Sequence, residues 1–331
     1  MLADPLDQPA DIRTLHALRR AGVLDDATLH LALGHLQTRG DWLAWARLNL
    51  MVIGALLMLS GVVFFFAYNW ADMGRFQKLG LIFVALAGHA LGAWWLGLGK
   101  LSGQVMLASA SVFTGVFLAV FGQIYQTGAD AYELFVGWSA LILPWVMIAR
   151  FAPLWMFWLL VVEVGAGLYW EQGPWDWPDE GLGLFFGLLN AAALILRESL
   201  MFRGFGWLSG EWLRLLLFVK MATALSCGVI FSILDRSTIP LAGAHIWIGL
   251  LVLAAGYYHY RYRQRDFACV SLAAMSLTVV SITWICERLS KISSDDLGMA
   301  LVMALVIVAG TAALTMWLTR VHQQMIQEAR S

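Results

Sequence analysis

The chain has 331 residues, of which 60% are hydrophobic and 13% are charged, and its mean hydropathy is +0.73. A soluble domain carries about 45–50% apolar and about 25% charged residues, so this apolar surplus must face something other than water. The formal net charge of −1 gives no reason to expect nucleic acid as a partner, because nucleic-acid binding needs a basic surface. We therefore predict an all-α, polytopic membrane protein.

The first 46 residues are polar and mixed, and we predict that they form a short cytoplasmic helical hairpin. Asp11 can cap a first helix that Gly22 breaks. Asp25 or Asp26 can cap a second helix, which Gly40 ends. A hairpin of about forty residues is too small to bury much core alone. We expect it to dock on the membrane domain or on a partner. Apolar residues fall on one face of each helix. They are Ile12, Leu15 and Leu18 in the first and Leu29, Ala32, Leu33 and Leu36 in the second.

Residues 47–331 are predicted to form one transmembrane helical domain of about ten spans. Each span is judged against the ~20 apolar residues that cross ~30 Å of hydrocarbon. The first long apolar run has the length of a full span, not of a signal peptide. The predicted spans are 48–69, 79–98, 104–121, 133–149, 151–170, 181–197, 212–233, 240–260, 267–287 and 297–319.

Lysine and arginine are distributed unevenly between alternate connections of these spans. Fifteen fall on one side, five fall on the other, and Lys220 stays inside a span. The positive-inside rule then places both termini in the cytoplasm. The richer side holds Arg13, Arg19, Arg20, Arg39, Arg47, Lys100, Arg150, Arg197, Arg203, Arg214, Arg261, Arg263, Arg265, Arg320 and Arg330. The poorer side holds Arg75, Lys78, Arg236, Arg288 and Lys291.

Pairs of small residues recur at the spacing of one helical turn. Gly88 with Gly92 and Gly183 with Gly187 are examples, and such pairs let helix backbones approach closely. We expect them to serve packing within the chain more than dimerisation.

The ends of the first and third spans carry aromatic rings, side-chain amides and carboxylates on the same predicted outer face. A ring supplies an apolar platform, and fixed donors and acceptors orient a sugar or a polar headgroup. The alternative is an ordinary interfacial aromatic belt with turn residues. The candidate ligand-binding residues are Tyr68, Asn69, Trp70, Asp72, Gln123, Tyr125, Gln126, Asp130, Tyr132 and Glu133.

Two motifs and the N-terminal hairpin carry a resemblance to a known family. The stretch 67–70 reads Ala-Tyr-Asn-Trp and is followed by Arg-Phe-Gln-Lys-Leu at 75–79, and the second motif runs from 121 to 130. Together they resemble a bacterial inner-membrane family catalogued as domain of unknown function 2157, over about residues 10–150. The resemblance implies a polytopic inner-membrane protein, similar to ones paired with other membrane proteins. The resemblance implies no particular substrate or reaction. The residues beyond about 150 resemble no named family and are predicted only to form further spans.

Four polar side chains lie inside predicted spans, where a central charge costs at least ~2.5–3.5 kcal/mol. Glu163 lies halfway through its span, and Asn190 lies at similar depth on the next antiparallel span. His89 is central in the second span, and Lys220 can snorkel toward the cytoplasm. Glu163, Asn190 and His89 predict a path for a proton or a polar solute; the alternative is a hydrogen bond between Glu163 and Asn190 that holds two helices together.

No motif of a known enzyme, metal site or cofactor appears in the sequence. Cys227, Cys269 and Cys286 form no C-x-x-C pair and are expected to be small core residues. We predict no metal and no cofactor, and we favour a non-enzymatic protein.

Three functional hypotheses remain open at this point. The first is a transporter-like protein that binds or transports a polar ligand, or a lipid or glycan headgroup, at its outer face. The second is a membrane scaffold that assembles other membrane proteins. The third is an enzyme that acts on a lipid-linked substrate through Asp72, Asp130 or Glu133. The lipid bilayer is an expected partner in all three.

Overall fold

The computed structural model describes residues 21–36, 70–174, 180–234, 240–291 and 296–328, together with isolated positions between 15 and 68. Every element in these described residues is helical. The chain divides into two compact units, Met1–Gly74 and Arg75–Ser331. The predicted first span, 48–69, and the first helix of the predicted hairpin lie largely outside the described residues. Both remain predictions.

In the first unit, the described helix is α2 (Asp26–Leu36). The carboxylate of Asp25 accepts a hydrogen bond from the backbone N–H of Thr28 at 2.9 Å, which is the capping contact predicted for this helix. Hydrogen bonds from Thr28, first from its side chain and then from its backbone, lower the pKa of Asp25. Gly22 has a positive φ of 74° and provides the turn before the helix.

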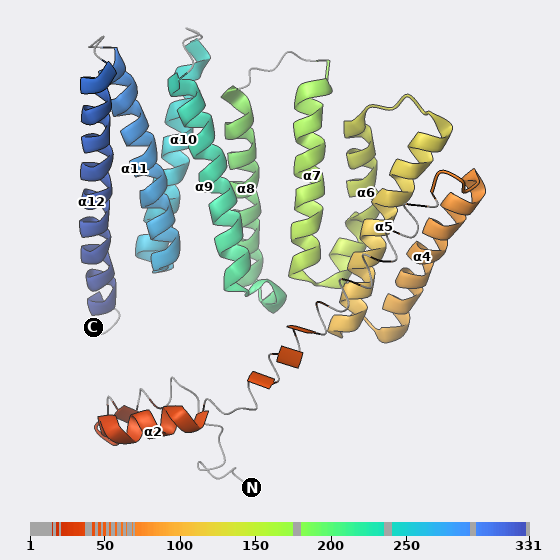
Figure 1. The fold of residues 1–331 in the computed structure, drawn as a ribbon, viewed down its shortest axis with the longest axis horizontal. Helices are drawn as coiled ribbons and strands as arrows, with labels where there is room; N and C mark the ends of the chain where they lie inside the picture. The colour runs from red at the N-terminus through yellow and green to blue at the C-terminus, as the bar shows by residue number, and fades with distance from the viewer. Residues whose placement is uncertain are drawn as a thin grey trace. The chain divides into compact units, whose positions relative to one another are not determined.

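The second unit contains nine helices within its described residues, and neighbours along the chain run antiparallel (Figure 1). Two short turns, η2 (Gly206–Leu208) and the π-helical η3 (His259–Arg263), lie at helix ends. The helices are α4 (Arg75–Leu96), α5 (Leu101–Tyr125), α6 (Ala131–Ala149), α7 (Ala152–Gln172), α8 (Glu180–Phe202), α9 (Glu211–Leu234), α10 (Pro240–Tyr258), α11 (Phe267–Ser290) and α12 (Asp296–Glu328).

In the described part of the chain, eight of these helices are long and apolar enough to cross a membrane, namely all except α10. Helix α10 occupies the place of the predicted span 240–260. Several helices extend beyond the predicted spans. Helix α8 continues to Phe202 and α12 continues to Glu328, because polar residues at the membrane surface can prolong a helix past its hydrocarbon segment. The exact number of ten spans remains a prediction.

The antiparallel order gives the second unit two ends with different charge. We call them the Lys100 end, where α4 meets α5, and the Arg75 end, where α5 meets α6. Nine described basic residues lie at the Lys100 end and four lie at the Arg75 end. The nine are Lys100, Arg150, Arg197, Arg203, Arg214, Arg261, Arg263, Arg265 and Arg320. The four are Arg75, Lys78, Arg288 and Lys291.

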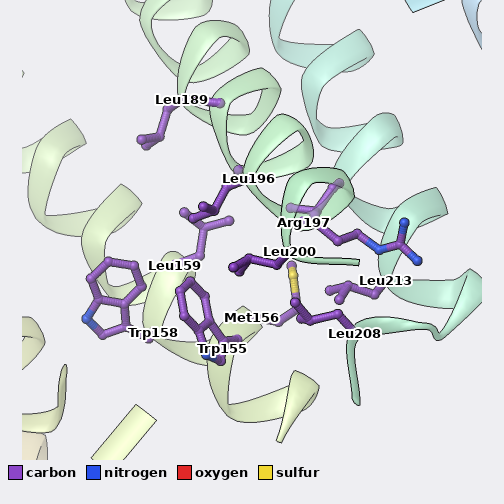
Figure 2. Close-up of a pocket in the computed structure, with 13 residues that line it drawn as sticks. Trp155, Met156, Trp158, Leu159, Leu189, Leu196, Arg197, Leu200, Leu208 and Leu213 are labelled. Carbon is purple, nitrogen blue, oxygen red and sulfur yellow. The ribbon is translucent and has the colours of Figure 1, made fainter. Parts of the chain in front are cut away.

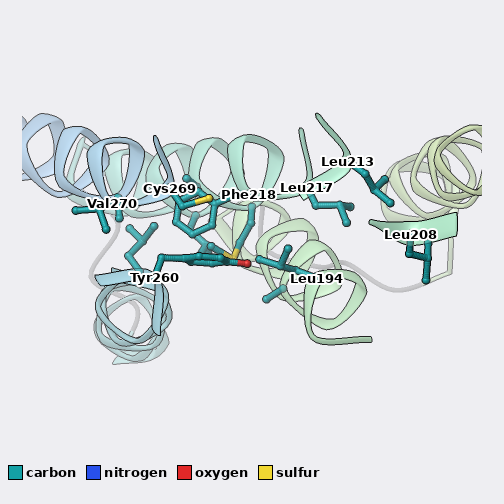
Figure 3. Close-up of a cluster of buried hydrophobic side chains, with 14 of the residues drawn as sticks. Leu194, Leu208, Leu213, Leu217, Phe218, Tyr260, Cys269 and Val270 are labelled. Atoms are coloured by element: carbon teal, nitrogen blue, oxygen red, sulfur yellow. The ribbon is translucent and has the colours of Figure 1, made fainter. Parts of the chain in front are cut away.

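Two buried apolar clusters hold the second unit together, and α7 contributes to both. One cluster joins α4, α5, α6 and the start of α7, where Leu154 is fully buried. The other joins α8 to α12 and includes Ala152 and Leu159 of α7; Figure 3 shows Phe218, Tyr260 and Cys269 at its centre. Helix α7 packs closely on α6, and α8 packs closely on α9, whereas α7 and α8 touch at few places. Helix α7 is therefore the junction between two helix groups.

A close backbone contact between α8 and α9 is made by glycine. A Cβ atom on Gly183 would lie 2.5 Å from the Cα of Gly228, and one on Gly187 would lie 2.2 Å from the side chain of Leu225. The predicted Gly183–Gly187 pair therefore packs internally, between α8 and α9. Gly88 differs, because a Cβ atom there meets nothing within 4 Å.

We expect Gly183→Ala to destabilise the protein by about 1–3 kcal/mol, since the new methyl group forces two helix backbones apart. The matched control is Gly88→Ala, which adds the same group in open space and should cause no loss. Thermal unfolding in detergent micelles measures the difference. Equal melting temperatures for the two variants would show that the α8–α9 contact is not this close.

Candidate functional site

Four of the predicted ligand-binding residues line one groove between the end of α5 and the start of α6. Gln123 and Gln126 come from the α5 side, and Asp130 and Glu133 come from the α6 side. The groove has a volume of about 390 Å³. Its apolar part is made by Leu118, Ala119, Phe121, Gly122, Leu134 and Gly137.

The connection between these helices leaves its polar groups available. Helix α5 ends with Gln126 in the left-handed conformation, at φ 45°, and the backbone N–H of Gln126 donates to the carbonyl of Gly122. This conformation is uncommon for a residue other than glycine. Asp130 stands at the N-cap of α6, but its side chain makes no capping hydrogen bond. Its carboxylate can therefore serve a ligand in the groove.

The polar lining of the groove consists of carboxylates, neutral amides and the Thr127 hydroxyl. Asp130 and Glu133 supply two carboxylates, Gln123 and Gln126 supply two amides, and no basic side chain is among the lining residues. Glu133 lies in the first turn of α6, where the helix dipole favours a negative charge. Such a lining suits hydroxyl and ammonium groups, which donate hydrogen bonds, better than it suits phosphate.

The two predicted tyrosines of this region do not line the groove. Tyr125 packs on Phe121, with ring centroids 4.6 Å apart. Tyr132 packs edge-on against Tyr169 of α7 at 5.1 Å, which joins the start of α6 to the end of α7. Both rings therefore stabilise the surroundings of the groove.

The candidate residues at the end of the first predicted span belong to the first unit. Tyr68 is 87% exposed, Asp72 is exposed, and Trp70 is half-buried. Asn69 lies outside the described residues. These four residues remain predicted ligand contacts.

Inside the helix bundle, Glu163, Asn190 and Lys220 form one hydrogen-bonded cluster, which we call the Glu163 triad. The amide of Asn190 donates to Oε1 of Glu163 at 2.8 Å, and the ammonium of Lys220 donates to Oε2 at 2.6 Å. Glu163 is 9% exposed and Asn190 is 2% exposed. The triad joins α7 to α8 and α9, where few other contacts exist.

The triad changes two expectations from the sequence. Lys220 turns to Glu163 and does not extend toward the membrane surface, because an ion pair inside the bundle offsets the cost of burying both charges. His89 stands apart: its Nδ1 lies 2.7 Å from the carbonyl of Ala85, and its ring packs on Phe113. Among the described residues it contacts no member of the triad. The polar path through His89 remains a prediction.

A second polar network lies at the Lys100 end, and the sequence did not predict it. The Glu198 carboxylate accepts hydrogen bonds from Arg197 at 2.6 Å, Gln264 at 2.9 Å and Tyr260 at 3.3 Å. Arg261 forms a two-fold ion pair with Glu328, at 2.8 and 2.9 Å, which raises the pKa of Arg261. The only sign of this network in the sequence is that a carboxylate lies near each group of arginines. Counting charges treats those arginines as solvent-facing, so it does not predict their ion pairs and hydrogen bonds.

An apolar cavity of about 220 Å³ separates α7 from α8 at this same end. Figure 2 shows Trp155 and Leu159 of α7 opposite Leu196 and Leu200 of α8, with the guanidinium of Arg197 directed toward Leu213. No group of three or more metal-binding side chains occurs among the described residues.

Comparison with known proteins identifies one family. Residues 16–155 match the model of the family described as "Predicted membrane protein (DUF2157)", and the groove between α5 and α6 lies within that match. Comparison with curated proteins and with solved structures finds no match. The family description and the apolar helices agree that this is a membrane protein.

We expect Glu163→Gln to cost up to about 3–5 kcal/mol of stability, because it leaves Lys220 without its counter-charge. The double change Glu163→Gln with Lys220→Met should recover part of that loss. Glu171→Gln, at the exposed end of α7, is the matched control and should stay within about ±0.5 kcal/mol. Unfolding free energies in detergent provide the measurement. A Glu163→Gln variant as stable as the control would mean that the triad does not hold α7 in place.

Proposed function

We propose that this protein is a multi-pass protein of a bacterial inner membrane that binds a hydroxyl- or amine-bearing headgroup, of a lipid or a glycan, in the α5–α6 groove. The observation that carries the proposal is that Gln123, Gln126, Asp130 and Glu133 converge on one groove. All four are polar residues that the amino-acid sequence places at the predicted outer face.

The ligand class follows from the lining. Carboxylates accept hydrogen bonds from hydroxyl or ammonium groups, and the amides of Gln123 and Gln126 can donate as well as accept. Phe121 adds an aromatic face beside them, which suits the apolar face of a sugar ring. A headgroup whose acyl chains stay in the bilayer would enter without leaving the membrane.

The side of the membrane follows from the charge difference between the two ends. The Lys100 end carries nine described basic residues against four at the Arg75 end, and the basic end of a membrane protein faces the cytoplasm. In this proposal the groove faces away from the cytoplasm, and both termini lie inside.

The binding test compares variants inside the groove with matched variants outside it. We expect Asp130→Asn to weaken headgroup binding roughly 10–100-fold, since a hydrogen bond that involves a charged group contributes about 1.5–3 kcal/mol. Gln123→Ala should weaken it about 2–10-fold, since a hydrogen bond of a neutral amide contributes about 0.5–1.5 kcal/mol. Gln172→Ala and Glu171→Gln, at the same end but outside the groove, should bind like the unchanged protein. The measurement is the thermal shift caused by glucosyl diacylglycerol and by phosphatidylethanolamine, with phosphatidylcholine, whose headgroup has no hydrogen-bond donor, as the comparison lipid.

The same variants distinguish the other two hypotheses. Loss of co-purifying membrane proteins with no lipid-dependent thermal shift in any variant would favour a scaffold. Loss of lipid turnover in Asp130→Asn and Glu133→Gln alone, with binding retained, would favour an enzyme. Equal effects of the groove variants and their controls would contradict headgroup binding in this groove.

The predicted orientation has its own test. In a chain whose three cysteines are replaced by alanine, Gln126→Cys and Lys100→Cys each place one thiol at an exposed position, at opposite ends of the helices. We expect a membrane-impermeant maleimide to label Gln126→Cys on intact cells and Lys100→Cys only after the membrane is opened. The reverse pattern would place the groove in the cytoplasm.

A further inference from the structure

The cavity between α7 and α8 is a candidate binding site separate from the α5–α6 groove. It begins at the Lys100 end, near Leu208 and Leu213, and extends inward to Leu159, Leu189 and Leu217. Each of these three inner leucines is within about one helical turn of a member of the Glu163 triad. The cavity is therefore a narrow apolar slot that runs from one membrane surface toward the triad.

Three buried N–H groups near the outer part of this slot have no hydrogen-bond partner among the described residues: Trp155 Nε1, Trp207 Nε1 and Arg197 Nε. Trp155 and Arg197 line the slot, and the Trp207 ring packs on Trp155 with centroids 6.1 Å apart. Arg197 is only 5% exposed. Buried donors are nearly always paired in folded proteins, so these three point to an acceptor that the described part of the chain does not supply.

The charge around the mouth of the slot favours an anionic acceptor. Against the nine basic residues of the Lys100 end stand four described acidic residues, Glu198, Glu211, Asp266 and Glu328. Basic pockets between membrane helices on the cytoplasmic side suit anionic lipid headgroups. With a volume of about 220 Å³ the slot is too small for a helix, whose diameter with side chains is about 10–12 Å, but its leucine and tryptophan walls suit a single hydrocarbon chain.

We propose that this slot binds one acyl chain of an anionic glycerophospholipid, with the ester or phosphate oxygens of the lipid accepting hydrogen bonds from Trp155, Trp207 and Arg197. The chain lies between α7 and α8, where the two helix groups touch at few places. The lipid completes the packing between these groups on the cytoplasmic side of the triad.

The test uses matched tryptophan variants within the slot. Trp158 also lines the slot, but its N–H donates to the carbonyl of Ser139 at 3.0 Å. The protein is reconstituted in vesicles of equal phosphatidylglycerol and phosphatidylcholine, extracted gently, and examined by native mass spectrometry. We expect Trp155→Phe to lower retained phosphatidylglycerol about fivefold, because one hydrogen bond to the lipid is lost. Trp158→Phe should keep the lipid and lose thermal stability.

A second pair of variants tests the acyl chain. Ala192 lines the slot on α8, so Ala192→Phe should fill it and reduce retention of both lipids. Ala304→Phe, at an exposed position of α12, is the control and should change nothing. Phosphatidylglycerol with a photoreactive acyl chain should crosslink to residues 155–159 and 189–200.

Several outcomes would overturn the proposal. Crosslinks confined to other helices, equal lipid retention in Trp155→Phe and the unchanged protein, or retention unaffected by Ala192→Phe would each do so. Retention of detergent or free fatty acid in place of phospholipid would also refute the assignment, and equal retention of both lipids would refute its anionic part. These results are independent of the α5–α6 groove, which lies at the opposite end of the helices.

Discussion

The bilayer interior offers no hydrogen-bond partners, so a charged side chain in the middle of this bundle is stabilised by partners within the protein. The Glu163 triad is where this constraint acts most strongly. One carboxylate is satisfied by an amide at 2.8 Å and an ammonium at 2.6 Å, each from a different helix. The Glu163 carboxylate would be costly to bury alone in hydrocarbon. With Asn190 and Lys220 as partners, it joins α7 to α8 and α9.

Helix α7 has a special place in the second unit for this reason. Its first residues pack into both apolar clusters, with Leu154 in one and Leu159 in the other. The middle of α7 contacts α8 and α9 through Glu163. Between Glu163 and the Lys100 end, the face of α7 toward α8 lines the slot. Close packing elsewhere is made by small residues, such as Gly183 against Gly228. The boundary between α7 and α8 combines the hydrogen bond from Asn190 to Glu163 with a few apolar contacts, such as Trp170 on Phe185.

The two candidate sites follow from the different chemistry of the two helix ends. At the Arg75 end, a short connection exposes carboxylates and amides and carries few basic groups, which suits a ligand that donates hydrogen bonds. At the Lys100 end, basic residues are abundant, and three buried N–H groups have no hydrogen-bond acceptor among the described residues. A lipid bilayer presents headgroups at both ends, so one bundle can use both sites without moving a ligand across.

The amino-acid sequence by itself determined the helical membrane class, the approximate limits of the described spans and the unequal charge of the two ends. It also indicated the groove, because Gln123 to Glu133 are close along the chain and one short turn must bring them together. Asn190 and Glu163 were placed at equal depth on neighbouring antiparallel spans, which is a matter of counting residues.

Only the tertiary structure decided how each helix is rotated about its own axis. Spans that are apolar on all sides carry no periodic signal for the face that meets a neighbour. The pairing of Lys220 with Glu163, the separate position of His89 and the slot beside Trp155 all depend on that rotation. The difference between Trp155, whose N–H lacks a partner, and Trp158, whose N–H binds Ser139, has the same origin. Residues three positions apart on one helix differ in this way because packing against α6 and α8 places them in different surroundings.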